Sequence, residues 1–260
     1  MILDELAAHA RERVAAARAR VPLEEIRAQA EALPRGDFRF EKALAGKGTA
    51  FICEIKKASP SRGVIDPQFD YIGIASQYEE AGADCISVLT EPKWFLGSDE
   101  IFRAIRLTVD VPMIRKDFTV DAYQIYEARV LGADAVLLIC ALLDTDTLRE
   151  YLAICDQLGL SALVETHDEA EMQSAVAAGA RLIGVNNRNL KDFSVDLGNA
   201  ARLRAGAPEG TIFIAEGGVS CPEDAAKLRQ AGADAILVGE YLMRSPDKQG
   251  ALQALREAAK

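Results

Sequence analysis

The sequence predicts a (β/α)8 barrel preceded by a helical extension, and three observations predict it. First, an apolar run follows each of Gly82, Gly132, Gly179 and Gly232, which lie about 50 residues apart. A glycine after a helical pattern is the usual C-cap, and the run behind it is typical of a strand buried on both faces of a parallel sheet. Second, four more strand candidates lie before and between these runs. Third, helical patterns fill the gaps, so that eight strands alternate with eight helices.

The first 48 residues contain two helical patterns and no predicted strand. Residues 2–20 place apolar side chains on one helical face, and Pro22 begins a second helix at its first turn. This helix runs to about Leu33, where Pro34 and Gly36 interrupt the pattern. We therefore expect a helical extension over residues 1–48, packed on a single barrel domain at residues 49–260.

From residue 50 onward, predicted strands and helices alternate along the chain. The strands cover 50–56, 85–89, 112–116, 135–140, 160–165, 182–185, 211–215 and 235–239. The helices cover 68–81, 98–108, 121–131, 144–158, 168–178, 197–204, 222–231 and 248–259. An open doubly wound sheet is the alternative, but it would need a glycine-rich dinucleotide turn after the first strand. Ser59-Pro60-Ser61 stands there instead.

Composition narrows the class of protein. The chain has 260 residues and a formal net charge of −10, which argues against nucleic acid and anionic membranes as partners. No segment has 18 consecutive apolar residues, and the N-terminus lacks the apolar stretch of a signal peptide. The five cysteines show no paired spacing and there are only two histidines. We expect a cytoplasmic monomer with reduced thiols, no metal site and no cofactor.

Polar side chains follow the predicted strands at their carboxyl ends, where barrel enzymes place their active sites. Glu54 and Lys56 are two residues apart at the end of the first strand, so they point to the same face. The other strand ends carry Thr90 and Glu91, then Trp94 and Phe95; Arg115, Lys116 and Asp117; Glu165 and His167; Asn186, Asn187 and Arg188; and Glu216. A solvated rim would be polar too, but it would not so often end an apolar run on a charge. We predict that three carboxylates, two lysines and an asparagine converge on one site: Glu54, Glu165, Glu216, Lys56, Lys116 and Asn186.

Glycines after the last two strands indicate a phosphate site. In this fold the seventh and eighth loops often hold a phosphate through backbone N–H groups. Gly217, Gly218 and Gly239 would let the backbone approach the anion closely, and Ser59 could add a hydroxyl. Trp94 and Phe95 could stack on a flat ring, although core or lid packing is the more common role of such a pair.

Lysines among carboxylates suit acid–base chemistry on a sugar phosphate. A Schiff-base nucleophile is the competing role, and it requires a neutral amine. The nearby Glu54, Glu165 and Glu216 would keep Lys56 and Lys116 charged. The composition of the site therefore favours general-acid and anion-binding roles.

Seven segments taken together resemble the indole-3-glycerol phosphate synthase family. They are EIKKASPSRGVI (54–65), TEPKWFLGS (90–98), PMIRKDF (112–118), LVETHDEAE (163–171), GVNNRNLKDF (184–193), IAEGGVS (214–220) and VGEYLM (238–243). They stand in the order of that family. The resemblance implies a (β/α)8 barrel of tryptophan biosynthesis that closes the ring of 1-(2-carboxyphenylamino)-1-deoxyribulose 5-phosphate with loss of CO2 and water.

The resemblance also implies a role for each site residue. Lys116 resembles the general acid that protonates the ketone, and Lys56 resembles the lysine that holds the substrate carboxylate. Glu165 resembles their acid/base partner, and Glu54 resembles a carboxylate that orients the lysines. The remaining implied contacts are Asn186 and Glu216 around the sugar hydroxyls, Ser59, Arg188, Gly218 and Gly239 at the phosphate, and Phe95 at the anthranilate ring.

Two positions depart from the family pattern. Gly217 stands where a serine is usual, and Tyr241 stands where a small residue is usual. The first removes a hydroxyl from the mouth of the barrel, and the second adds bulk beside the phosphate. Two alternatives to the synthase stay open. One is a related sugar-phosphate isomerase on the same barrel, and the other, which Gly217 and Tyr241 suggest, is a non-catalytic barrel that binds a phosphorylated ligand.

Overall fold

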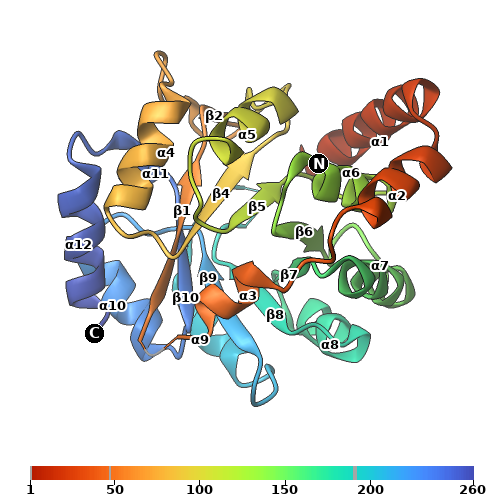
Figure 1. Cartoon of the computed structure of the whole chain (residues 1–260). Helices are drawn as coiled ribbons and strands as arrows, with labels where there is room; N and C mark the ends of the chain where they lie inside the picture. Colours follow the sequence, from red (N-terminus) through yellow and green to blue (C-terminus); the bar gives the residue numbers. More distant parts are fainter. Residues whose placement is uncertain (1, 47, 190–191) are drawn as a thin grey trace.

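The computed structural model describes residues 2–46, 48–189 and 192–260, and its centre is a closed parallel barrel (Figure 1). The strand order is β1-β10-β9-β8-β7-β6-β5-β4, and β4 pairs back with β1. The barrel strands are β1 (Ala50–Ile55), β4 (Cys85–Leu89), β5 (Met113–Lys116), β6 (Ala135–Ile139), β7 (Ser161–Thr166), β8 (Leu182–Asn186), β9 (Ile212–Glu216) and β10 (Ala235–Val238). The predicted (β/α)8 barrel is confirmed.

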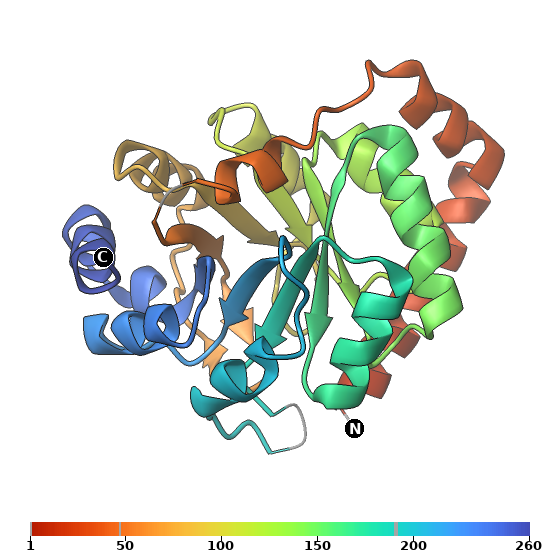
Figure 2. The same ribbon diagram turned by 90° about the horizontal axis from the view of Figure 1, so that it is seen from below.

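Helices surround the strands in Figure 1, and Figure 2 shows the barrel from the side, with the strand arrows running in one direction. They are α4 (Tyr71–Glu80), α5 (Asp99–Arg106), α6 (Tyr123–Leu131), α7 (Thr145–Leu158), α8 (Glu169–Ala178), α9 (Gly198–Arg204), α10 (Pro222–Gln230) and α12 (Lys248–Ala258). Several begin at a side-chain cap: Asp70, Ser98, Asp144 and Asp168 each accept a backbone N–H from the first turn. Such caps satisfy N–H groups that the helix itself leaves unpaired.

Alternation along the strands divides the apolar side chains into two clusters. Outward-facing residues such as Phe51 and Cys53 pack beneath the helices, whereas Ile52 faces the barrel interior. The same interior cluster contains Ile114, Leu163 and Ile214. Residues i and i+2 of a strand share a face. The residue two positions after each of these interior side chains therefore also faces the interior. This alternation positions the site described below.

The extension consists of α1 (Ile2–Arg20), α2 (Leu23–Ala32) and α3 (Arg39–Leu44). The first two helices, red in Figure 1, lie outside the barrel beside α6. The third was not predicted, because residues 34–37 end the second helical pattern. Phe40 and Leu44 of α3 are buried in the interior cluster, so this short helix closes the amino-terminal end of the barrel.

Two other small elements also differ from the expectation of plain loops. β2 (Ala58–Ser59) and β3 (Gly63–Val64) form an antiparallel hairpin directly after β1. A five-residue helix, α11 (Glu240–Arg244), follows β10. Both are too short to carry a periodic signal in the sequence. Among the described residues, no helix is both long and apolar enough to span a bilayer.

Candidate active site

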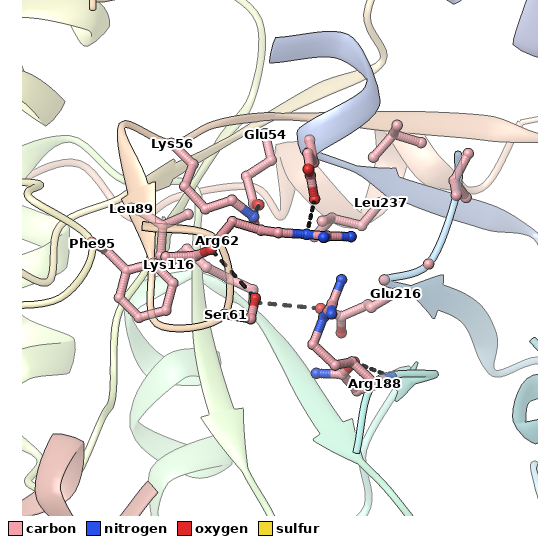
Figure 3. A pocket seen from close by; sticks show the side chains of 18 of the residues that line it. Glu54, Lys56, Ser61, Arg62, Leu89, Phe95, Lys116, Arg188, Glu216 and Leu237 are labelled. Carbon is pink, nitrogen blue, oxygen red and sulfur yellow. Dashed lines mark hydrogen bonds and ion pairs between the residues drawn. The ribbon is translucent and has the colours of Figure 1, made fainter. Parts of the chain in front are cut away.

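A cavity of about 890 Å³ opens at the carboxyl ends of the strands. The residues to which the resemblance gives a role all line it: Glu54, Lys56, Ser59, Phe95, Lys116, Glu165, Asn186, Arg188, Glu216, Gly218 and Gly239. Other polar or aromatic residues near the strand ends are not among its lining residues: Thr90, Glu91, Trp94, Arg115, His167 and Asn187. Figure 3 shows several of these side chains facing the same space. The structure therefore brings together groups that lie as far apart in the chain as β1 and β10.

The charged groups form the top layer of the barrel interior. Glu54, Lys116, Glu165 and Glu216 each stand two residues after an apolar side chain of the interior cluster. The barrel interior thus changes from an apolar layer to a charged layer over two residues of each strand. The three carboxylates are almost fully buried, with at most 4% of each residue exposed.

Lys116 lies between two of these carboxylates. Its Nζ is 3.6 Å from Glu165 Oε2 and 3.5 Å from Glu216 Oε2. Burial alone would lower the pKa of the Lys116 ammonium, but Glu216, Glu165 and Glu54 more than offset it, and the pKa is raised. Lys116 is therefore a charged donor at neutral pH, as expected from the sequence.

Glu216 is protonated much more readily than an ordinary glutamate. Burial raises the pKa of its carboxyl to about 8, and the charges of Glu165 and Glu54 act in the same direction, whereas Lys116 opposes them. Both of its oxygens are buried without a hydrogen-bond partner within the described part of the chain. Gly184 makes room for it, because a Cβ at that position would lie 2.0 Å from Glu216 Oε1. A carboxyl of this kind is ready to donate to a ligand.

Glu54 and Lys56 form a second pair. Lys56 Nζ donates to Glu54 Oε1 at 2.5 Å. Burial would raise the pKa of Glu54, but Lys56 and Lys116 lower it below its usual value, so this carboxylate stays ionised. Gly239 approaches the pair closely, since a Cβ there would lie 2.5 Å from Glu54 Oε1 and 3.1 Å from Lys56 Nζ.

The expected phosphate end of the cavity contains glycines with positive φ and arginine side chains. Gly217 and Gly218 have φ values of 76° and 90°. Arg188 lies there with Arg62 of the β2–β3 hairpin (Figure 3). Arg62 Nε donates to Glu240 Oε2 at 3.1 Å, and Arg244 donates to the other oxygen of Glu240. This ion pair joins the hairpin to α11 across the mouth.

The backbone holds the oxygen end of the Asn186 side-chain amide. Its Oδ1 accepts the backbone N–H of Arg188 at 2.9 Å, which leaves Nδ2 as the donor toward the cavity. Tyr241 also lines the cavity, and it packs against the outer apolar cluster at the same time.

The aromatic pair after β4 is divided between two roles. Buried Glu91 accepts the backbone N–H groups of Lys93, Trp94 and Phe95, which shapes this loop. Phe95 lines the cavity, whereas Trp94 makes an edge contact with His9 of α1 at 5.6 Å between ring centroids. Of the two stacking candidates, only Phe95 is therefore placed to contact a flat ligand.

The extension contributes to the site directly. Ile2, Leu3 and Leu6 of α1 line the cavity. Arg13 makes a two-pronged ion pair with Asp117, at 3.0 and 2.6 Å, and this aspartate is the chain neighbour of Lys116. The sequence did not point to these contacts, because an amphipathic helix does not reveal which surface it covers.

Fold and site together define a barrel enzyme for acid–base chemistry on a small anionic substrate. The comparison with known proteins specifies the family. Residues 3–255 match the family model described as indole-3-glycerol phosphate synthase, and the chain belongs to this family.

Relatives agree with this assignment over their whole length. The chain is 54% identical to the indole-3-glycerol phosphate synthase of Ruminiclostridium cellulolyticum over 260 residues, covering 100% of each chain. It is 48% identical to that of Leuconostoc mesenteroides over 259 residues, covering 98% of this chain and 99% of the relative. A more distant solved structure, thiamine phosphate pyrophosphorylase from Pyrococcus furiosus, shares the fold. Its TM-score is 0.62 at 17% identity, covering 85% of this chain and 97% of that one.

Proposed function

We propose that this chain catalyses the ring closure of 1-(2-carboxyphenylamino)-1-deoxyribulose 5-phosphate to indole-3-glycerol phosphate, with release of CO2 and water, in tryptophan biosynthesis. The observation that carries the proposal is the position of Lys116, a buried ammonium between Glu165 and Glu216 at the top of the barrel interior. A ketone that a carbon nucleophile attacks develops negative charge on its oxygen, and this group can stabilise the charge and supply a proton.

The cavity offers a partner for each part of the substrate. The phosphate is assigned to Gly218 and Gly239 with Arg188 and Ser59, because backbone N–H groups and cations are the usual donors to phosphate. The substrate carboxylate is assigned to Lys56, whose ammonium Glu54 orients at 2.5 Å. The aromatic ring is assigned to the face near Phe95. Asn186 and the protonated Glu216 are assigned to the sugar hydroxyls.

The positive charge of Lys116 in the free site suits the first step of the reaction. Lys116 protonates the ketone oxygen as the ring carbon attacks, and CO2 then leaves with its electron pair returning to the aromatic ring. Loss of the new hydroxyl as water needs an acid, and loss of the neighbouring C–H proton needs a base. Glu165 is in reach of Lys116 and serves this second stage.

A fluorescence assay tests the proposal. On addition of the carboxyphenylamino sugar phosphate, the purified chain should generate indole fluorescence in proportion to enzyme concentration. Binding of inorganic phosphate without any product would favour the non-catalytic barrel that Gly217 and Tyr241 suggest. Isomerisation of a simple sugar phosphate without indole formation would favour the isomerase.

We further propose that residues 1–48 act as a cap of the barrel at residues 49–260, and that the enzyme works as a cytoplasmic monomer. The contacts of Leu3, Leu6 and Arg13 with the site support the first point. The net charge of −10 and the free cysteines support the second. Sedimentation equilibrium at micromolar concentration should give the mass of one chain, and a dimer mass would contradict it.

A further inference from the structure

A chain of three titratable side chains leads from the reacting groups to the surface. His167 Nε2 lies 3.4 Å from Glu165 Oε1, and His167 Nδ1 lies 3.0 Å from Glu171 Oε2. The exposed fraction of the side chains rises outward, from 4% for Glu165 to 17% for His167 and 20% for Glu171. Within the described residues, His167 is not part of the cavity lining. The reaction as proposed above gives it no role.

Glu171 fixes the tautomer of the imidazole. Its Oε2 accepts the backbone N–H of His167 at 2.8 Å as well as lying beside Nδ1. A carboxylate is an acceptor, so Nδ1 carries a hydrogen. The ring is then oriented with Nε2 toward Glu165, in the way a carboxylate orients the histidine of a catalytic triad.

This tautomer has a consequence at Nε2. In a neutral ring with Nδ1 protonated, Nε2 is an acceptor, and it would oppose a lone pair of an ionised Glu165 in a buried setting. Nε2 is buried without a hydrogen-bond partner in the described structure. A single proton between Nε2 and Glu165 Oε1 removes the conflict, whether it resides on the imidazole or on the carboxyl.

The groups around the imidazole favour keeping that proton. Burial alone would lower the pKa of His167, but its hydrogen bond to Glu171 and the charges of Glu165, Glu171 and Glu216 raise it. Cys140 lies in the same environment, where burial and the charges of Glu171, Glu165 and Asp168 raise the pKa of its thiol to about 12, so it stays neutral near pH 7. Lys116 contacts the other oxygen of Glu165, with its Nζ 3.6 Å from Oε2.

We propose that His167 and Glu165 share one proton and form the acid/base unit of the dehydration step, with Glu171 holding the imidazole in place. The proposal rests on the function proposed above. Glu165 touches the substrate, and His167 is a positioning residue that acts through it.

Proton stoichiometry fits this division. The ketone oxygen leaves as water and needs two protons, one as the carbon–carbon bond forms and one as the carbon–oxygen bond breaks. One proton returns from the neighbouring C–H bond, whose electron pair forms the new double bond. Lys116 supplies the first proton, and solvent restores it between turnovers. The Glu165–His167 pair gives the second proton and takes the third, so it ends the cycle unchanged.

The shared proton can be tested without any activity. The chain has two histidines, His9 and His167, so imidazole NMR signals of the whole protein are assigned with the variant His9→Gln. We expect His167 to titrate above an ordinary histidine and Glu165→Gln to lower its pKa. An unchanged His167 titration in Glu165→Gln would overturn the proposal, whether or not the protein makes indole.

Pre-steady-state kinetics separates this role from a structural one. In His167→Gln the amide can still donate to Glu165, but it cannot exchange a proton. Dehydration should slow by roughly 10²-fold, near the low end of general acid–base effects, while ring closure continues. CO2 should then appear before the indole chromophore, with KM little changed. The alkaline limb of kcat should lose the contribution from deprotonation of the pair, whereas the contribution of Glu216 remains.

His9→Gln is the matched control, because His9 also lies beside a buried carboxylate, 3.1 Å from Glu91 Oε1. It should release CO2 and indole together, as the wild type does. Equal slowing of both products in His167→Gln would indicate a structural role and overturn the proposal. Absence of both products in the wild type would instead refute the synthase function, and the NMR titration would still decide on the shared proton.

Discussion

Replacement of Lys116 is the most informative single change, because this residue carries the proposed first proton transfer. Its ammonium is within 3.6 Å of one carboxylate and 3.5 Å of another. At the effective dielectric constant of about 20 that suits protein sites, each such attraction is worth about 5 kcal/mol before the cost of burial. Loss of a partner from a buried ion pair typically costs about 3–5 kcal/mol of stability. Proton uptake by Glu216 would moderate this cost.

The catalytic loss should exceed what stability explains. General acid catalysis is worth about 10²–10⁴ in rate, or about 3–5 kcal/mol in the barrier. Lys116→Ala should lower kcat by that factor with little change in KM. Lys116→Arg should recover only a small part, because a guanidinium keeps the charge but does not release a proton near neutral pH.

The assay measures kcat from indole fluorescence, at a temperature well below the melting temperature of each variant. Lys42→Ala is the control, because Lys42 makes an exposed 3.0 Å ion pair with Asp37 away from the cavity. It should change stability by less than about 1 kcal/mol and leave kcat unchanged. A fall in kcat below about fivefold in Lys116→Ala, with a lower melting temperature, would refute proton donation, since it falls well short of the general-acid range.

Four further predictions concern the rest of the site. Gly239→Val should raise KM through its contact with the Glu54–Lys56 pair and the lost approach to the phosphate; an unchanged KM in a folded variant would contradict the phosphate assignment. Tyr241→Ser should bind inorganic phosphate more tightly by calorimetry, and equal or weaker binding would show that the ring does not crowd the anion. Deletion of residues 2–33, which spares the buried α3, should reduce kcat more than solubility. A soluble deletion variant with full kcat would show that these residues have no role in catalysis. The raised pKa of Glu216 implies that this carboxyl binds a proton more tightly in the folded than in the unfolded chain. Its contribution to stability is therefore complete below about pH 4.5 and is lost as the pH rises through about 8. Thermal melts of Glu216→Gln should decline less over this window than those of the wild type, and parallel declines would contradict it.

The sequence was sufficient to predict which side chains at the strand ends share one cavity, because two regularities combine there. Parallel strands in a barrel all end at one mouth, and alternation places Lys116 on the face of Ile114 and Glu216 on the face of Ile214. Side chains distant in sequence could therefore be assigned to one cavity before any distance was known. Glycine caps marked the helix ends independently.

Contacts between elements could not be predicted in this way. The Arg62–Glu240 pair depends on the short hairpin and on α11, whose few residues carry no periodic signal. Gly184 is functional only through the carboxyl of Glu216 that occupies its missing side-chain space. Trp94 was a reasonable stacking candidate by residue type, but its direction depends on the packing of α1, which the local sequence does not specify.

The most direct test of the account is the product stoichiometry of the wild-type enzyme. CO2 and indole-3-glycerol phosphate should form in equal amounts from the carboxyphenylamino sugar phosphate, with one proton taken up for each, because the substrate carboxylate leaves as neutral CO2. Substrate that is consumed or isomerised without CO2 release would contradict the account.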